Sequence, residues 1–391
     1  MSHFTVLVIG KDVEKQLAPY HEFECTGDDD EYVQDIDETE ELRKEYESST
    51  VNRMKSSTGE LEETWGDKFF RDPTKEESEK IGIGIGSGYV DGIEFYSKDW
   101  KDGKGYRPKV RFEPEGWTKV TLPRKEIESF AEFCSSYHGH HIVPFGEQPD
   151  LKDKHKYGYT LVDANGEVVK AVDRTNPNRK WDWYQIGGRW NGFFKLKHPF
   201  RIAIDRAING CDLTPRLGSP GANRLDADYK PPTADRADQC LKSDIDIDGM
   251  RHDATMRAEE KYDLYTRTVA GLPEIIVWDV IRDKHKDNIE AARDEYNGQP
   301  GVRALRANDE TMWEEPKDFM CTRDEYIERA RNGALATFAV VKDGKWYERG
   351  DMGWFGVVSD EKDENDWLSQ FSSLVDSLPN DTLLTIVDAH T

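Results

Sequence analysis

Two nearly continuous apolar runs stand close to the two ends of the sequence. The first covers residues 4–9 (FTVLVI) and the second covers residues 382–387 (TLLTIV). Runs of this length without polar interruption are typical of strands that are buried on both faces. At the edge of a sheet they would leave apolar surface in water, so we expect them to be neighbours in the centre of one sheet.

Alternating apolar positions predict two hairpins. Runs rich in Val, Leu and Tyr flank the Asn-Gly dipeptide at 165–166, and a similar pair of runs flanks the Asp-Gly dipeptide at 343–344. Both dipeptides favour the backbone angles of two-residue hairpin turns. We expect both hairpins to belong to the central sheet.

Apolar residues at helical spacing predict further elements. The pattern indicates amphipathic helices at 122–136 and 365–378, with Asn365 as the N-cap of the second. A longer helical pattern begins near Ala237 and continues to about residue 332.

The composition changes after His198, where residues 200–235 are rich in Gly, Pro, Asn and Asp and predict a loop or linker. We therefore expect an α+β protein with a central mixed or antiparallel sheet in which the N- and C-terminal strands pair. Residues 1–199 and 333–391 are expected to form one discontinuous core domain, and residues 200–332 a mostly helical insertion.

Aromatic residues gather around a glycine pair in residues 180–194, KWDWYQIGGRWNGFF. If this stretch is a strand, Trp181, Trp183 and Gln185 point to one face and Asp182, Tyr184 and Ile186 to the other. The Gly-Gly pair allows a bulge or bend and leaves the backbone around Arg189 without side chains. The arrangement suits a planar or anionic ligand, and it suits equally a core corner where two sheets meet.

Glycines are frequent between Gly82 and Gly105, and six cations fall within residues 98–111. The glycines match neither G-x-G-x-x-G nor G-K-[ST], so no nucleotide-binding loop of those types is predicted. Backbone N–H groups beside cations hold anions, whereas a plain surface loop would leave the same charges solvated. Our hypothesis is that this loop folds over the tryptophan-rich stretch and closes a pocket. The ligand-binding residues of that hypothesis are Lys98, Asp99, Arg107, Lys109, Trp181, Trp183, Tyr184, Arg189 and Trp190.

The formal net charge is −24, from 78 acidic and 54 basic residues. Because phosphate binding needs positive potential, this charge disfavours direct binding to duplex nucleic acid or to an anionic membrane. It permits docking on a basic surface of another protein. The five cysteines form no C-x-x-C pair, and no segment predicts a signal peptide or a membrane span, so we expect a cytoplasmic protein with reduced thiols.

Two clusters contain residue types that bind metals. One comprises His21, Glu22, Glu24 and Cys25, and the other comprises His138, His140 and His141. Neither has the ligand spacing of a known class of metal site, so we assign no metal and no cofactor. Whether either cluster binds a metal stays open at this point.

Four blocks of the sequence are distinctive in combination. They are the opening MSHFTVLVIG, the segment SKDWKDGKGYRPKV, the long block VPFGEQPDLKDKHKYGYTLVDANGEVVKAVDRTNPNRKWDWYQIGGRW and the ending DTLLTIVDAHT. Together they cover about half the chain, and they resemble a family of uncharacterised proteins from bacteriophages and bacterial genomes. The resemblance implies a phage or prophage setting, hence the host cell cytoplasm. It brings no known activity, so it implies no catalytic residue.

Two functions are consistent with these features. The first is an acidic accessory protein that binds a host or phage protein, or sequesters a small anionic ligand, for example to counter host defences. The second is an enzyme acting on a nucleotide or another phosphorylated substrate. In the second case Lys98, Arg107, Lys109 and Arg189 would hold the anion, Trp181 or Trp190 would stack a base, and His140, His141 or Asp99 would transfer protons.

Overall fold

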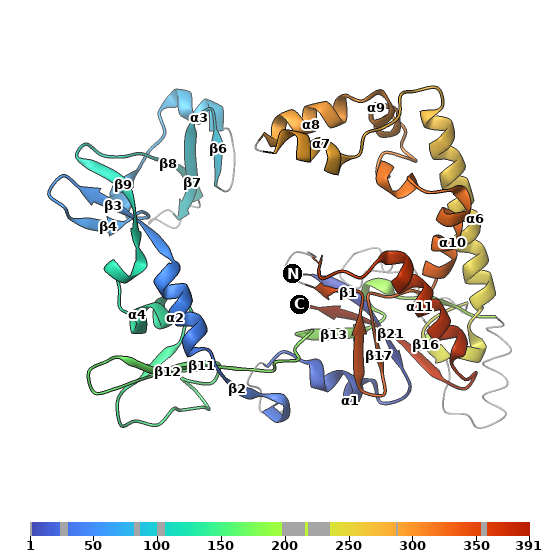
Figure 1. Ribbon diagram of the computed structural model, residues 1–391, viewed down its shortest axis with the longest axis horizontal. Helices are drawn as coiled ribbons and strands as arrows, with labels where there is room; N and C mark the ends of the chain where they lie inside the picture. Colours follow the sequence, from blue (N-terminus) through green and yellow to red (C-terminus); the bar gives the residue numbers. More distant parts are fainter. Residues whose placement is uncertain are drawn as a thin grey trace. The chain divides into compact units, whose positions relative to one another are not determined.

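The computed structural model describes residues 2–23, 30–81, 87–99, 106–197, 216–217, 235–286, 288–352 and 358–391. The described chain is α+β, as expected, and contains mixed sheets. It divides into two compact units, coloured along the sequence in Figure 1. Unit 1 consists of Met1–Tyr32 and Asn176–Thr391, and unit 2 consists of Val33–Thr175.

This division differs from the one expected from the sequence, which separated residues 200–332 from the rest. Residues 33–175 form a unit because they carry their own sheets and their own apolar clusters. Residues 236–241 lie inside the expected insertion, yet they add a strand to the central sheet of unit 1. The described part of 200–332 therefore contains this strand besides its helices.

The central sheet of unit 1 pairs the first and last strands of the chain, which confirms the expected pairing. β1 (His3–Ile9) runs antiparallel to β21 (Leu383–His390) along its whole length and parallel to β17 (Ala339–Lys342). The strand order is β14-β16-β21-β1-β17-β18, with β14 at Phe194–Lys195, β16 at Arg236–Leu241 and β18 at Lys345–Glu348. Two further strands join it: β13 (Trp183–Ile186) pairs with the last residues of β21, and β15 (Arg216–Leu217) pairs with β16.

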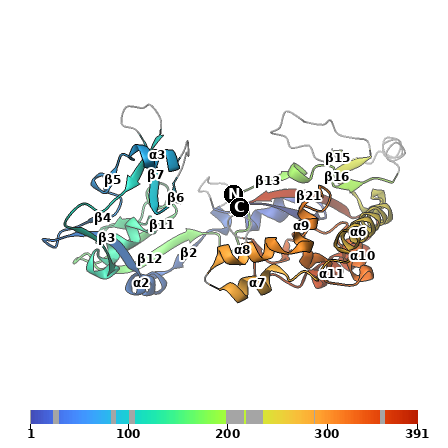
Figure 2. The same ribbon diagram turned by 90° about the horizontal axis from the view of Figure 1, so that it is seen from above.

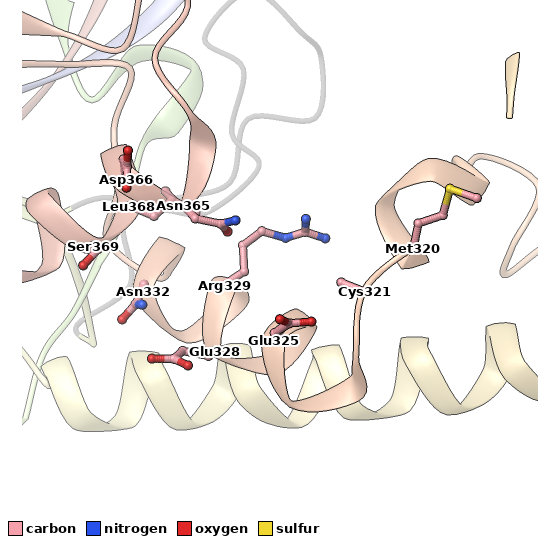
Figure 3. Close-up of a pocket in the computed structure, with 10 residues that line it drawn as sticks. All are labelled: Met320, Cys321, Glu325, Glu328, Arg329, Asn332, Asn365, Asp366, Leu368 and Ser369. Atoms are coloured by element: carbon pink, nitrogen blue, oxygen red, sulfur yellow. The ribbon is translucent and has the colours of Figure 1, made fainter. Parts of the chain in front are cut away.

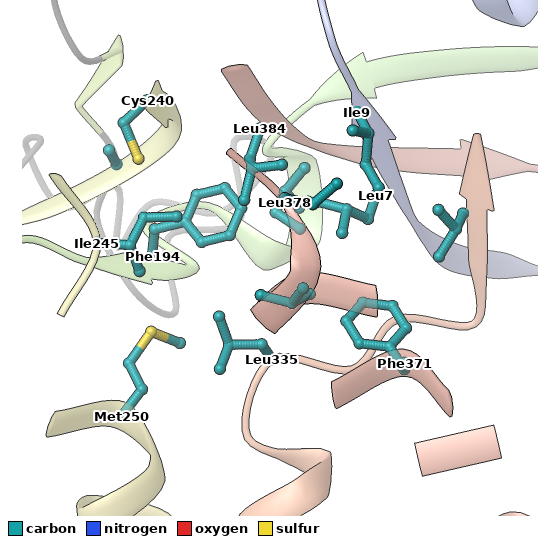
Figure 4. Close-up of a cluster of buried hydrophobic side chains, with 14 of the residues drawn as sticks. Leu7, Ile9, Phe194, Cys240, Ile245, Met250, Leu335, Phe371, Leu378 and Leu384 are labelled. Atoms are coloured by element: carbon teal, nitrogen blue, oxygen red, sulfur yellow. The ribbon is translucent and has the colours of Figure 1, made fainter. Parts of the chain in front are cut away.

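Apolar side chains cover both faces of this sheet, as continuous apolar strands require. On one face Leu7, Ile9, Leu384 and Ile386 pack against α11 (Glu364–Ser377) in the largest core cluster. Figure 4 shows Phe194 of β14 in this cluster, between Ile245 and Leu384. The opposite face packs residues such as Val6 and Val8 against the short helix α1 (Val13–Leu17).

Five further helices of unit 1, labelled in Figure 2, pack on one another and, through α10, on α11. They are α6 (Ile247–Val269), α7 (Trp278–His285), α8 (Ile289–Gly298), α9 (Pro300–Arg306) and α10 (Arg323–Gly333). α6 begins ten residues later than the helical pattern suggested, because residues 236–241 are a strand and Asp246 then caps the helix through the Gly249 N–H. α11, in contrast, begins at Glu364, one residue before the expected N-cap Asn365, because Asp363 accepts the Asp366 N–H and caps the helix.

The described residues of unit 2 form three sheets. The first has the order β10-β11-β12-β2, with β10 at His141–Val143, β11 at Gly158–Val162, β12 at Val168–Thr175 and β2 at Gln34–Asp37. The second consists of β4 (Leu61–Glu63), β3 (Thr50–Ser56) and β9 (Trp117–Pro123). The third consists of β5 (Phe70–Arg71), β8 (Tyr106–Arg111), β7 (Ile93–Asp99) and β6 (Gly88–Val90). The helices are α2 (Thr39–Ser48), α3 (Lys75–Ile81) and α4 (Phe130–Ser136).

The two expected hairpins form, but in different sheets. The Asp343-Gly344 hairpin, β17–β18, lies in the central sheet as predicted. The Asn165-Gly166 hairpin, β11–β12, lies in the first sheet of unit 2, so the prediction for it was wrong. The reason is that α2 and α4 bury Val168 and Ala171 of β12, giving this hairpin a separate core.

The expected helix at 122–136 is only half correct. Residues up to 123 belong to β9, which pairs with β3, and α4 begins at Phe130 after a capping box between Ser129 and Glu132. Across the described ranges, no helix combines the length and apolar character needed to cross a membrane.

Candidate functional site

Three rings stand next to one another at one end of the central sheet of unit 1. His3 is the register partner of His390 between β1 and β21, and His390 is the partner of Trp183 between β21 and β13. The centroids of the two imidazoles are 5.0 Å apart. Trp183 stacks on His390 at 5.0 Å with an interplanar angle of 18°, and His3 meets Trp183 edge-on at 5.3 Å. Sheet pairing therefore fixes two imidazoles and one indole as a single cluster.

Each imidazole is held by a carboxylate. Nδ1 of His3 lies 2.8 Å from Oδ1 of Asp388, which is only 2% exposed. Nδ1 of His390 lies 2.7 and 2.8 Å from the two oxygens of Asp182. Because an ionised carboxylate only accepts hydrogen bonds, each ring donates its Nδ1–H and keeps its orientation.

The same two carboxylates also bind the backbone of the tryptophan-rich stretch. Asp182 accepts the N–H of Trp183 at 2.7 Å, and Asp388 accepts the N–H of Arg189 at 2.9 Å. Each carboxylate thus fixes one imidazole and one segment of the loop beside it. The cluster is therefore positioned by hydrogen bonds as well as by sheet pairing.

The Nε2 atoms are the ring nitrogens that the carboxylates do not hold, on a His3 side chain that is 13% exposed and a His390 side chain that is 4% exposed. Among the described residues, none forms a hydrogen bond with Nε2 of His3 or of His390. A neutral imidazole whose Nδ1–H points at a carboxylate carries its lone pair on Nε2, so Nε2 accepts a proton and returns it. Two such atoms in one cluster provide an acid and a base.

The glycine pair explains how the loop reaches these carboxylates. At Gly187 and Gly188 a Cβ atom would lie 2.4 Å from the carboxylate of Asp238 and 2.3 Å from that of Asp388. Both glycines have positive φ, of 78° and 52°. Only glycine lets the backbone pass this close over buried carboxylates in that conformation. The pair therefore anchors the loop, a more specific role than the bend expected from the sequence.

A cavity of about 730 Å³ opens beside His390, a size typical of sites for small molecules. Its polar lining comprises His390, Asp182, Glu22, Glu348, Asp351, Arg179 and Lys180, and its apolar lining includes Phe4, Trp181 and Met352. Although burial works to lower the pKa of Lys180, hydrogen bonds to Glu348 and Asp351 raise it above its ordinary value. Lys180 is therefore a bound cation in the cavity wall and a poor nucleophile.

The structure separates the aromatic residues that the sequence grouped together. Trp181 and Tyr184 belong to the core on the α1 face, where their rings meet edge-on at 5.0 Å. Trp190 packs against the core on the α11 face, and Trp183 alone is largely exposed, at 43%. The expected alternation fails at Trp181 because β13 starts two residues later, so Trp181 precedes the regular strand. For three of these four rings the core interpretation holds.

The predicted cationic residues lie in unit 2. Lys98 and Asp99 end β7 and Arg107 lies opposite them on β8, with Lys98 and Arg107 in register. The side chains of these three fall outside the described part of the chain. Nζ of Lys109 binds Oδ1 of Asp72 at 2.6 Å. Since each unit is described by itself, the convergence of these residues with Arg189 remains a prediction. Arg189 is exposed and, among the described residues, has no ion-pair partner for its guanidinium.

The two candidate metal clusters show structural contacts. His21 stacks on Trp181 at 4.3 Å and its Nε2 lies 2.9 Å from the carbonyl oxygen of Asp182, whereas Glu24 and Cys25 lie outside the described residues. His140 is buried with Nδ1 3.2 Å from Oγ1 of Thr160, and burial together with the charge of His138 lowers the pKa of its ring. Within the described ranges no group of three or more His, Cys, Asp or Glu side chains is arranged to hold a metal ion.

Another hollow, of about 500 Å³, lies between α10 and α11. Figure 3 shows Arg329 extending from α10 into it, towards the loop that carries Met320 and Cys321. Arg329 donates to the carbonyl oxygen of Asp318 at 2.7 Å, so its charge is already used to hold that loop. This hollow has no acid–base pair comparable to the one at His3 and His390.

Sequence reasoning missed His3, Asp388 and His390, although the signal was present. These residues occupy the polar ends of the two apolar runs whose pairing was predicted, and antiparallel pairing brings such ends together. Carrying the predicted pairing one step further would have placed two histidines and a buried aspartate side by side. No family model, no curated protein and no solved structure matches the chain.

Proposed function

We propose that the protein is an enzyme that cleaves a phosphate ester, with His3 and His390 as its acid and base. The observation that supports this proposal is the pair of imidazoles 5.0 Å apart, each fixed through Nδ1 by a carboxylate. In this proposal Nε2 of one ring activates the incoming oxygen at a phosphorus atom and Nε2 of the other assists the outgoing oxygen.

The proposed step is hydrolysis. Nε2 of one neutral imidazole takes a proton from water while the water oxygen forms a bond to phosphorus. The bond from phosphorus to the ester oxygen breaks, and that oxygen takes the proton from Nε2–H of the other, protonated imidazole. The two rings then exchange protons with solvent and regain their starting states. Asp388 and Asp182 act as positioning residues, since they hold the Nδ1–H groups and do not meet the phosphate.

Arg189 is the cation that this proposal assigns to the phosphate. Its backbone N–H is bound to the carboxylate that also holds His3, so the side chain starts beside the reacting groups. Its guanidinium has five donors and suits the oxygens of a phosphate. Of the expected ligand-binding residues, Arg189 and Trp183 are therefore the two that this proposal retains.

The test uses bis(4-nitrophenyl) phosphate as a chromogenic ester. We expect His3→Gln and His390→Gln each to lower kcat by about 10²–10⁴-fold, and the double variant to lose little more than the worse single variant. Asp388→Asn and Asp182→Asn should lower kcat and shift the pH profile of kcat/KM, which a purely structural role would not do. His252→Gln, an exposed histidine of unit 1, is the matched control and should keep full activity.

Equal turnover by His3→Gln, His390→Gln and the wild type would refute the assignment. If the wild type cleaves no phosphate ester, the remaining function is the other one expected from the sequence. In that case the protein acts without catalysis, by docking through its net charge of −24 on a basic surface of a host or phage protein.

A further inference from the structure

We propose that the substrate is a nucleotide diester that carries few charges, with one base stacked on Trp183. This inference rests on the proposed function and adds the class of substrate to it. It joins the exposed indole and the anchored arginine to a neighbouring cavity, which shares His390 and Asp182 with the cluster and has more carboxylates than cations in its wall. The residues that line this cavity do not include Trp183, Arg189 or His3.

Trp183 is built as a rigid platform. The residue is 43% exposed although its backbone N–H is bound by Asp182 and the plane of its ring lies nearly parallel to that of His390. An indole held in this way loses little conformational freedom when a second flat ring stacks on it. Base stacking on an aromatic side chain is also tolerant of sequence, because every base has a flat face. Trp183 is therefore the residue of the tryptophan-rich stretch that suits a nucleobase.

The distance from this platform to the reacting groups fits a nucleotide. Trp183 stands on β13, the strand next to His390 on β21, so the two lie one strand spacing apart. The indole centroid lies 5.0 Å from that of His390 and 5.3 Å from that of His3, so a base stacked on the free face of Trp183 stays next to both reacting groups. A phosphate ester without a flat ring would leave the exposed indole unused.

The charges of the cavity limit how many phosphates the substrate has. The wall contains the four carboxylates Glu22, Asp182, Glu348 and Asp351 against two cations, Arg179 and Lys180. Lys180 is already bound by Glu348 and Asp351. These carboxylates can accept hydrogen bonds from ribose hydroxyls or from the amino group of a base, but they repel further phosphates. A diester with a single charge fits this wall, whereas a triphosphate does not.

Binding is measured by calorimetry on the double variant His3→Gln/His390→Gln, so that no ligand is consumed. The ligands are adenylyl-(3′,5′)-adenosine, which has one phosphate and two bases, ATP, and dimethyl phosphate, which has no base. We expect adenylyl-adenosine to bind most tightly. Adding Trp183→Leu should weaken its binding roughly tenfold to hundredfold, and Trp183→Phe should restore part of the loss. Trp313→Leu removes a more exposed tryptophan of unit 1, at 81%, and should leave binding unchanged.

The outcomes separate this inference from the proposed function. If bis(4-nitrophenyl) phosphate is cleaved through the two histidines while Trp183→Leu and Trp313→Leu bind adenylyl-adenosine equally well, the nucleotide inference is wrong and the enzyme assignment stands. Tighter binding of ATP than of adenylyl-adenosine would refute the charge argument. If adenylyl-adenosine binds through Trp183 but neither ester is cleaved, the protein binds nucleotides and the catalytic assignment falls. Circular dichroism of each variant verifies that a loss of binding is not a loss of fold.

Discussion

Replacing Gly188 by alanine tests how tightly the loop is fixed over Asp388. The new Cβ would lie 2.3 Å from both Cβ and Oδ2 of Asp388, far inside van der Waals contact. The backbone at Gly188 also has a φ of +52°, which an L side chain adopts only with strain. Asp388 cannot withdraw freely, because it is 2% exposed and bound to His3 and to the Arg189 N–H.

The expected loss of stability has two parts. The left-handed conformation costs alanine about 1–2 kcal/mol. Displacing the carboxylate breaks at least one of its two charge-assisted hydrogen bonds, each worth about 1.5–3 kcal/mol. We therefore expect Gly188→Ala to lower the free energy of unfolding by about 3–5 kcal/mol.

Gly344→Ala is the matched control in the same unit. Gly344 also has a positive φ, of 69°, but nothing lies within 4 Å of its Cβ position, so only the conformational cost of about 1–2 kcal/mol applies. The assay is urea unfolding followed by tryptophan fluorescence, since most described tryptophans lie in unit 1. If the two variants lose equal stability, the contact with Asp388 has no energetic weight and the anchoring argument fails.

Three further predictions concern other parts of the chain. Phe194 is 1% exposed in the largest core cluster, so Phe194→Ala should lower the free energy of unfolding by about 3–5 kcal/mol. Phe145 is 69% exposed, so Phe145→Ala should change that free energy by no more than about 0.5 kcal/mol. Urea unfolding of both variants tests the two expectations. Burial, with the charge of His138, lowers the pKa of His140 below 6.5. The unfolded chain therefore binds the proton more readily, and the free energy of unfolding should fall as the pH drops below that value. His140→Gln should remove part of this slope between pH 7 and pH 5, and an unchanged slope would contradict the assignment. The hydrogen bonds from Arg71 lower the pKa of Glu77 to about 2. Arg71→Gln should therefore raise the pKa of Glu77 towards its ordinary value, which an NMR titration measures. A pKa that stays near 2 would assign the shift to Thr74 instead.

Sequence patterns predicted the fold where burial alone decides it. The runs at 4–9 and 382–387 had to be central and adjacent, and they are, because no other position hides both of their faces. The hairpin at Asp343-Gly344 was likewise predictable from its turn. The sheet to which a hairpin belongs was not predictable, as the Asn165-Gly166 hairpin shows, because it depends on which helices cover the strands.

The site was predictable only in part, for a related reason. Trp183 and Arg189 were expected as ligand-binding residues from composition, because rings and a lone cation beside glycines stand out in a sequence, and both contact the two-histidine cluster or its carboxylates. In the sequence, Trp181 and Trp190 cannot be distinguished from Trp183. Their side chains pack on the core because β13 starts only at Trp183 and because of the path of the loop that follows it. His3 and His390 carry no local motif at all. Their significance comes from strand register, which links residues from opposite ends of the chain.

The pairing of β1 with β21 also governs how the protein is made. A ribosome produces β1 before unit 2 and β21 after it, so β1 waits through the synthesis of the intervening chain without its antiparallel partner. Unit 2 emerges complete during that wait and carries its own cores, so it can fold first. Until β21 has been made, the apolar β1 has to be shielded, which makes the nascent chain a natural client for chaperones. A chain interrupted before β21 would have His3 but neither Asp388 nor His390, so the two-histidine cluster forms only after β21 has been made.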